Sequence, residues 1–143
     1  MSRGTAQTIM AFDYGQKRIG VAVGQTVSRT ATALRIVPAK HGNPQWRQLS
    51  ELIDEWGPDL FVVGMPAHED LRPQPLHDDI ERFSRRLSGR YNLPVEFIDE
   101  RLSSFAAGGD VATGSEALDA GAAKMILISW LEQIPLQPTP ENP

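Results

Sequence analysis

Short apolar segments alternate with polar turns along the chain, and five of them have the length of a buried β-strand. These strand-length segments cover residues 8–12, 19–23, 32–37, 60–63 and 95–98. The first two are separated only by the polar turn 13–18, which favours a β-hairpin. The segment 32–37 alternates apolar with polar or small residues before Pro38 and fits a third strand.

Apolar residues at helical spacing follow and separate the later strands. We expect helices at 44–56, 75–90, 105–112 and from about 113 to 133. Pro44 and Pro75 stand where a first helical turn tolerates proline, and Gly57 with Pro58 ends the first helix. Thr113 and Glu116 have the spacing of a capping box at the start of the last helix.

This order of elements predicts an α/β protein. Three consecutive strands favour an antiparallel arrangement, and the later strands, each preceded by a helix, favour parallel pairing. We therefore expect a mixed five-stranded sheet with helices on both faces. Sites in such sheets gather at the carboxyl ends of strands, so the polar residues that end each strand are the first candidates for chemistry.

Length and composition limit the class of protein. The chain has 143 residues, 41% of them hydrophobic and 22% charged, which is typical of a single globular domain. We expect one domain over residues 1–134 and a Pro-rich, disordered tail over 135–143. The chain has no cysteine, and its apolar runs are far shorter than a membrane span, so we expect a cytoplasmic protein. The net charge of −4 argues against a protein that coats polyanions, although local basic patches remain possible.

Carboxylates stand at three of the candidate positions. Asp13 ends the first strand, Asp99 and Glu100 end the last, and Asp119 lies two turns into the final helix. Counting along that helix puts Asp119 on the apolar face that includes Ala123, where an isolated carboxylate is costly unless it is paired or bound to a metal. Clustered carboxylates are the hard oxygen ligands that Mg²⁺ prefers, and two such metals can drive phosphodiester hydrolysis.

Each carboxylate also has a simpler explanation. Asp13 is two residues before Gly15 and suits a turn, and Asp99 with Glu100 and Arg101 suits a solvated loop with a local ion pair. Asp119 suits an early helical position that interacts favourably with the helix dipole. Spacing alone leaves these alternatives open.

Five segments together carry a family resemblance. They are FDYGQKRIGVAVG at 12–24, VVGMP at 62–66, PLHDDIERFSRRL at 75–87, FIDERLSS at 97–104 and LDAGAAKMILISWLEQ at 118–133. In this order and at this chain length they resemble the YqgF/RuvX family. Its members are bacterial, Holliday-junction-resolvase-like proteins regarded as pre-16S rRNA nucleases. The resemblance covers about residues 8 to 133.

The resemblance implies an RNase H-like fold and a metal-dependent endonuclease that processes the 5′ end of pre-16S rRNA. It implies that Asp13, Glu100 and Asp119 are the catalytic metal ligands, with Mg²⁺ or Mn²⁺ as cofactor and no organic cofactor. Neighbouring residues in a strand point to opposite faces, so Asp99 and Glu100 should point differently, and the resemblance rather than the spacing selects Glu100. The implied partners are structured RNA or branched DNA, possibly in ribosomal particles, and no membrane.

Basic residues near these positions are candidates for phosphate contacts. Lys17 and Arg18 follow Asp13 closely, although an exposed hairpin turn has the same composition. Arg101 follows Glu100 and suits either a phosphate contact or a carboxylate partner. A stripe at helical spacing suits either a nucleic-acid backbone or an ordinary solvated face. Its members are Arg82, Arg85 and Arg86.

Three other functions compete with an rRNA nuclease. A Holliday-junction resolvase would share the chemistry but normally needs two sites in a dimer. A relative of ATPases or sugar kinases would use Asp13 and Gly15 on a nucleotide phosphate, but such proteins usually have two domains. A non-catalytic ribosome-assembly factor would bind RNA on an enzyme-like fold, and the acidic net charge mildly favours it.

Overall fold

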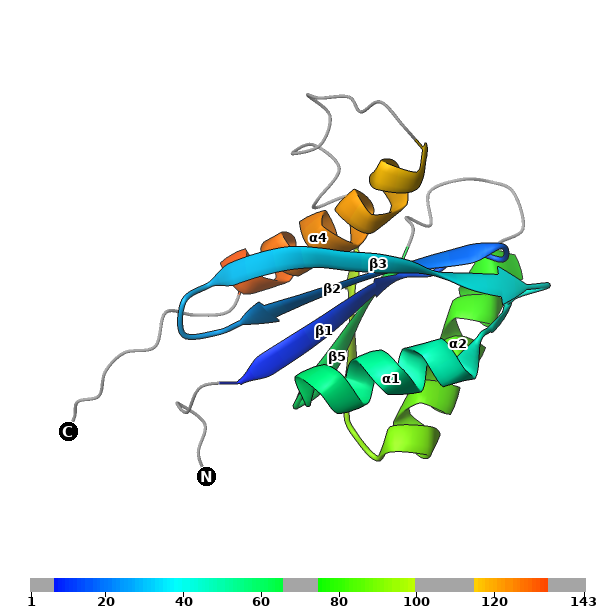
Figure 1. The fold of residues 1–143 in the computed structure, drawn as a ribbon, viewed down its shortest axis with the longest axis horizontal. Coiled ribbons are helices and arrows are strands. Elements are labelled where there is room, and N and C mark those ends of the chain that lie inside the picture. Colours follow the sequence, from blue (N-terminus) through cyan, green and yellow to red (C-terminus); the bar gives the residue numbers. More distant parts are fainter. Residues whose placement is uncertain (1–6, 66–74, 100–114, 134–143) are drawn as a thin grey trace.

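A six-stranded sheet with helices on both faces forms the protein (Figure 1). The computed structural model describes residues 7–65, 75–99 and 115–133, with side chains from 77 and 121 onward in the last two segments. The strands are β1 (Thr8–Asp13), β2 (Arg18–Gln25), β3 (Thr30–Lys40), β4 (Asn43–Pro44), β5 (Leu60–Met65) and β6 (Val95–Asp99). The helices are α1 (Trp46–Trp56), α2 (Pro75–Tyr91) and α4 (Ser115–Gln133).

The sheet has the strand order β4-β3-β2-β1-β5-β6. Strands β1 to β4 pair antiparallel, whereas β5 pairs parallel with both β1 and β6. This confirms the mixed sheet and the five predicted strands. The expected helix at 105–112 and the expected tail at 135–143 lie outside the described residues.

The strand count of five was wrong, because the two-residue strand β4 adds a sixth. After β3 the chain reverses at His41 and Gly42, which have φ angles of 52° and 84°. It then pairs back on β3 through Asn43 and Pro44 before α1 begins at Trp46. Two residues are too few to show an alternating pattern, so no local pattern indicated this strand.

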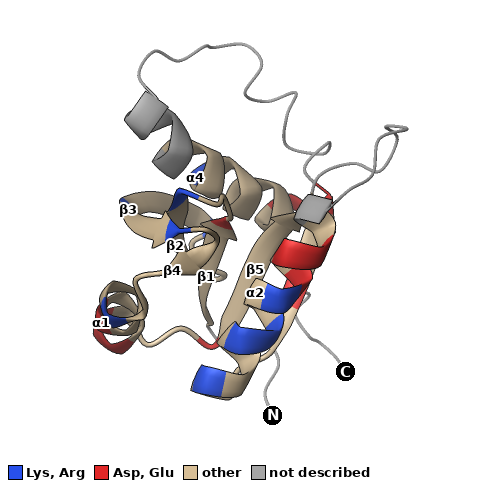
Figure 2. Ribbon diagram, turned by 90° about the vertical axis from the view of Figure 1, so that its right-hand side faces the viewer, with Lys and Arg blue, Asp and Glu red and all other residues tan. Residues whose placement is uncertain are grey.

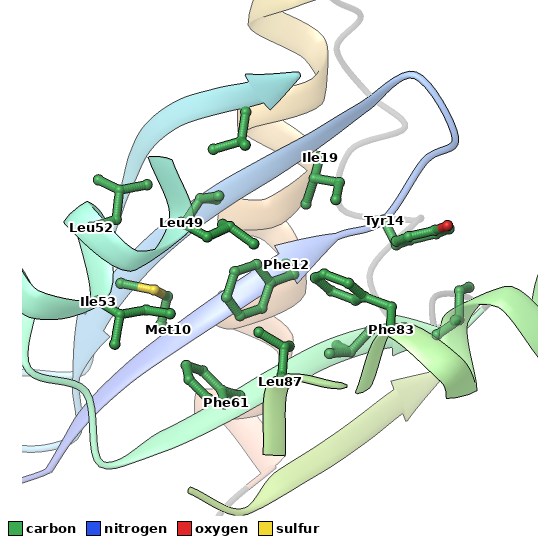
Figure 3. Packing of buried hydrophobic residues seen from close by; sticks show 14 residues of the cluster. Met10, Phe12, Tyr14, Ile19, Leu49, Leu52, Ile53, Phe61, Phe83 and Leu87 are labelled. Carbon is green, nitrogen blue, oxygen red and sulfur yellow. The ribbon is translucent and has the colours of Figure 1, made fainter. Parts of the chain in front are cut away.

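Alternating residues of the central strand supply two separate hydrophobic cores. Met10 and Phe12 of β1 pack against α1 and α2, and Figure 3 shows Phe12 beside Phe83 of α2. Ile9 and Ala11 point to the opposite face and pack against α4. Because side chains alternate along a strand, the parity of a residue tells which of these two faces it occupies.

Helix α4 lies close to the sheet because the facing positions of β2 are small. Residues 20, 22 and 24 of β2 are Gly, Ala and Gly, on the same face as Ala11. A Cβ added at Gly24 would lie 2.9 Å from Cδ2 of Leu127 in α4. Among the described residues, no helix combines the length and the apolar composition that a membrane crossing requires.

Candidate active site

Asp13 is the last residue of β1 and is partly buried at the carboxyl edge of the sheet. It has the parity of Ile9 and Ala11, so it lies on the face that α4 covers. The sheet places it directly opposite Gly20 of β2. On its other side Phe12 pairs with Val63, so the next residue of β5, Gly64, is the neighbour of Asp13.

Glycines therefore flank Asp13 on both adjoining strands. Gly20 and Gly64 are buried, and neither has a side chain that could occupy the space beside the carboxylate. Neither adjoining strand therefore places a side chain directly beside Asp13 on this face. The sequence reasoning did not identify this pair as shaping the site. Gly20, inside the predicted strand 19–23, was the available signal, whereas Gly64 directly followed the predicted strand 60–63 and marked its end.

Asp99 lies on the opposite face of the sheet from Asp13. In β6, Ile98 packs with the α4 core, so Asp99 has the other parity. Its pairing partner is Met65, one residue beyond the Gly64–Ile98 pair. Glu100 and Arg101 lie outside the described residues, so the choice of Glu100 over Asp99 stays a prediction.

Asp119 lies in α4, four residues before Ala123, which packs in the core that this helix shares with the sheet. Its side chain is outside the described part of the structure. Among the side chains that are described, no three of His, Cys, Asp or Glu form a group that could hold a metal ion. The ligand set Asp13, Glu100 and Asp119 therefore stays a prediction.

The loop that joins β1 to β2 carries Lys17, directly before Arg18 at the start of β2, and is held in place from two sides. On one side, the amide of Gly42 donates to the carbonyl of Gln16 and that of Ala39 to the carbonyl of Lys17, both at 2.9 Å. On the other, the Gln16 side-chain amide donates to Oδ2 of Asp79 in α2 at 3.0 Å. The backbone next to Asp13 is thus fixed before any substrate arrives.

Tyr14 anchors the same loop in the core. Its ring packs on Phe83 with 5.0 Å between centroids, and its hydroxyl donates to the carbonyl of Gly42 at 2.9 Å. Burial raises the pKa of the Tyr14 hydroxyl, and the negative charge of Asp79 raises it further, against smaller opposite effects of Arg82 and Arg86. The hydroxyl therefore keeps its proton, and its role as donor, at neutral pH.

The arginine stripe of α2 is exposed, but two of its three residues interact within the protein. Arg82 lies 3.6 Å from Asp79, and Arg86 donates to Oδ1 of Asn43 at 2.9 Å. Nη1 and Nη2 of Arg85 have no hydrogen bond or ion pair to the side chains that the structure describes. The stripe also lies on the helix that covers the face opposite Asp13, which weakens its candidacy as the main phosphate contact.

A family model described as "RuvX: Holliday junction resolvase" matches residues 7–133. The chain belongs to the RuvX family. It is 48% identical over 126 residues to a protein of Ralstonia pickettii named "Putative pre-16S rRNA nuclease", a match covering 88% of this chain and 87% of that protein. A protein of the same name from Glaesserella parasuis is 45% identical over 135 residues, covering 90% of this chain and 98% of that protein.

Solved structures of similar fold agree with the membership of the RuvX family. RuvC of Thermus thermophilus, in complex with a Holliday junction substrate, superposes with a TM-score of 0.53 at 13% identity, covering 88% of this chain and 95% of that one. The fowlpox virus Holliday junction resolvase gives 0.51 at 16% identity, covering 89% and 99%. At these identities the likeness establishes the fold alone, and it confirms the RNase H-like α/β architecture.

Proposed function

We propose that this RuvX family member is a metal-dependent endonuclease that hydrolyses phosphodiester bonds in the 5′ extension of pre-16S rRNA. The observation that carries the proposal is the position of Asp13, at the carboxyl end of the central strand between Gly20 and Gly64. Because both flanking residues are glycines, neither adjoining strand has a side chain here that would block the approach of a phosphate group to the carboxylate. The family of the chain supplies the reaction class, and the named relatives supply the substrate.

The donor chemistry of the proposed site suits a hard divalent cation. Asp13 offers carboxylate oxygens, and the other proposed ligands, Glu100 and Asp119, are carboxylates too. Such a cation, when bound, would activate the attacking water and stabilise the leaving oxygen. The protein's own residues would hold the ion and keep other side chains out of the space beside Asp13. Lys17 and Arg18 would neutralise the substrate phosphate.

Distances along α4 and β2 support Asp119 as a member of the proposed ligand set. Leu127 lies over Gly24, as the 2.9 Å approach to a Cβ added there requires. Position 119 is eight helical residues, about 12 Å, before Leu127. Gly20 is four strand residues, about 13 Å, before Gly24. Asp119 would then reach the level of Gly20 and its partner Asp13.

The test is cleavage of a 5′-extended small-subunit rRNA precursor with Mg²⁺, Mn²⁺ or EDTA. Asp13→Asn and Asp99→Asn form a matched pair, because both replace an aspartate at a strand end but on opposite faces of the sheet. We expect Asp13→Asn to lower the cleavage rate by about a thousandfold or more, and Asp99→Asn to lower it by less than about tenfold. Equal Tm values for both variants and the wild type would show that neither is unfolded.

Glu100→Gln and Asp119→Asn complete the proposed set and should resemble Asp13→Asn. Cleavage that persists in EDTA or in Asp13→Asn would overturn the proposed chemistry. A four-way DNA junction serves as the second substrate, because the family model is described as a Holliday junction resolvase. Faster cleavage of the junction than of the RNA would favour that alternative.

A further inference from the structure

Positive charge is concentrated in one continuous part of the chain. Residues 14–50 contain six Lys or Arg residues and no Asp or Glu. The remaining 106 residues contain eight basic and eighteen acidic ones, a net charge of −10. Strands β2, β3 and β4 and the start of α1 therefore form a cationic segment of a protein that is acidic as a whole.

Arg29 and Arg35, two of these six cations, make contacts within the fold. Arg29, in the β2–β3 turn, donates to the carbonyl of Leu131 near the end of α4. Arg35 donates to Oε1 of Gln48 in α1 at 2.8 Å. The Arg29 contact lies at the far end of β2 from Asp13, and the Arg35 contact is to α1, which packs on the face of the sheet opposite Asp13.

The basic residues at the Asp13 end form one group, which we call the basic corner. It consists of Lys17 and Arg18 in the β1–β2 connection and Lys40 and His41 at the β3–β4 turn. All four are exposed. Hydrogen bonds of 2.9 Å from Ala39 to Lys17 and from Gly42 to Gln16 join the two segments along their backbones.

Lys40 lies on the same face of the sheet as Asp13. Asp13 pairs with Gly20, Gly20 pairs with Ile36, and paired residues share a face. Lys40 is four residues beyond Ile36 and keeps its parity. Two strand spacings across and four residues along put the Cα atoms of Asp13 and Lys40 about 16 Å apart. Lys40 is too far away to contact the scissile phosphate, but it can contact phosphates on one side of it.

The basic corner suits this role better than the arginine stripe of α2 does. Asp78, Asp79 and Glu81 share α2 with that stripe, and Figure 2 shows red and blue residues along the same helix. Residues 14–50, which include the basic corner, contain no carboxylate, and the hydroxyl of Tyr14 fixes the turn by its bond to Gly42. A positively charged surface that is held rigidly relative to the catalytic carboxylate loses little entropy when it binds a polyanion.

We propose that the basic corner binds the sugar–phosphate backbone of the nucleic acid next to the cleaved bond, with Lys40 and His41 as contacts beyond the catalytic centre. This rests on the proposed nuclease function for the location of the cleaved bond. RNA and DNA offer the same phosphodiester chemistry, so the experiment uses a 5′-extended rRNA precursor fragment and a four-way DNA junction as separate probes.

The test measures equilibrium binding of the full chain in EDTA, over a range of salt concentrations, so that no cleavage is needed. The variant is Lys40→Gln with His41→Asn, because asparagine tolerates the positive φ angle of position 41. The matched control is Lys124→Gln, which removes an exposed cation from α4. We expect the double variant to raise the Kd about three- to tenfold near 0.1 M salt and to reduce the salt slope by about 0.7 to 0.9, the loss of one phosphate contact. The control should match the wild type.

A probe shortened on the flanking side provides the second readout. The wild type should lose its advantage over the double variant on this probe, whereas a variant that is merely destabilised would bind every probe less. An unchanged Kd and salt slope in the double variant would overturn the basic corner even if the wild type cleaves RNA. A wild type that binds as expected but never cleaves would overturn the nuclease and leave the basic corner standing. If the wild type binds neither probe, the inference is wrong.

Discussion

Tyr14 shows how one side chain links the core to the candidate site. It is 8% exposed, it directly follows Asp13, and its hydroxyl holds the β3–β4 turn through Gly42. A Cβ added at Gly42 would lie 2.5 Å from that hydroxyl, so the turn needs glycine here for space as well as for its φ of 84°. The alternation of apolar residues predicted that β1 is buried, but it did not indicate that the next residue would reach a distant turn.

Replacing Tyr14 with Phe should lower the free energy of unfolding by about 1 kcal/mol at pH 7, through loss of the hydrogen bond. Because the pKa of Tyr14 is raised by burial, the folded protein keeps this proton where the unfolded chain releases it. The wild type should therefore lose stability as the pH rises above about 10, and the variant should lose less. Urea unfolding at pH 7 and pH 10.5 measures both effects. A difference between the two proteins that grows with pH would contradict the assigned direction.

Helix α4 and strand β2 are packed closely together on one face of the sheet. The small residues of β2 that face α4 let the helix approach, and they also stand beside Asp13 at one end of the row. On the other face larger side chains fill the space, with Phe83 of α2 in contact with the rings of Phe12, Tyr14 and Trp46. The two faces thus have different roles: one positions the candidate site, and the other supplies an aromatic core.

Gly24→Ala should destabilise the protein by about 1–3 kcal/mol or more, as expected for overpacking. The added Cβ would lie 2.3 Å from the carbonyl oxygen of Thr30 and 2.9 Å from Leu127. Gly89→Ala is the control, since a Cβ there meets nothing within 4 Å and alanine favours the helix by about 0.5–1 kcal/mol. Thermal unfolding should give a lower Tm for the first and an equal or higher Tm for the second. Similar Tm values for Gly24→Ala and the wild type would show that α4 is not held so close to β2.

Sequence periodicity predicted the elements better than their ends. All five expected strands and three of the expected helices are present, and α2 extends over Pro75–Tyr91 against an expected 75–90. The segment expected to stop before Pro38 instead continues to Lys40 as β3. A proline in a strand is tolerated at a position with a free edge, and β3 pairs with β4 only through Ala39 and Lys40. Which edge is free is decided by the sheet, so the local pattern could not reveal it.

At the scale of the whole molecule, charge is distributed unevenly around the proposed site. A carboxylate set repels itself when it is empty, and the acidic remainder of the chain adds to this repulsion. The cationic segment, residues 14–50, begins immediately after Asp13 and offsets this negative charge on one side only. The net charge of −4 is therefore the sum of two unlike parts. The acidic part favours the binding of cations at the site, and the basic part favours the binding of polyanions beside it.

Bound metal should consequently stabilise the folded protein. We expect Mn²⁺ or Mg²⁺ at about 100 times its Kd to add about 2.7 kcal/mol, which raises the Tm by several degrees. Asp13→Asn should lose most of this increase, and EDTA should reverse it in the wild type. Thermal scans with and without metal make the measurement. An increase of the same size in Asp13→Asn would place the metal elsewhere.

The sequence by itself determined the order and type of the elements, because strand and helix periods are local properties of the chain. Its motifs also determined the family, and through the family the candidate residues Asp13, Glu100 and Asp119. Only the tertiary structure decided which face each residue occupies: that Asp13 and Lys40 share a face, that Asp99 does not, and that Gly20 and Gly64 border Asp13. It also decided that Arg82 and Arg86 interact within the fold. These properties depend on strand register and on contacts between residues far apart in the chain, and no local pattern encodes them.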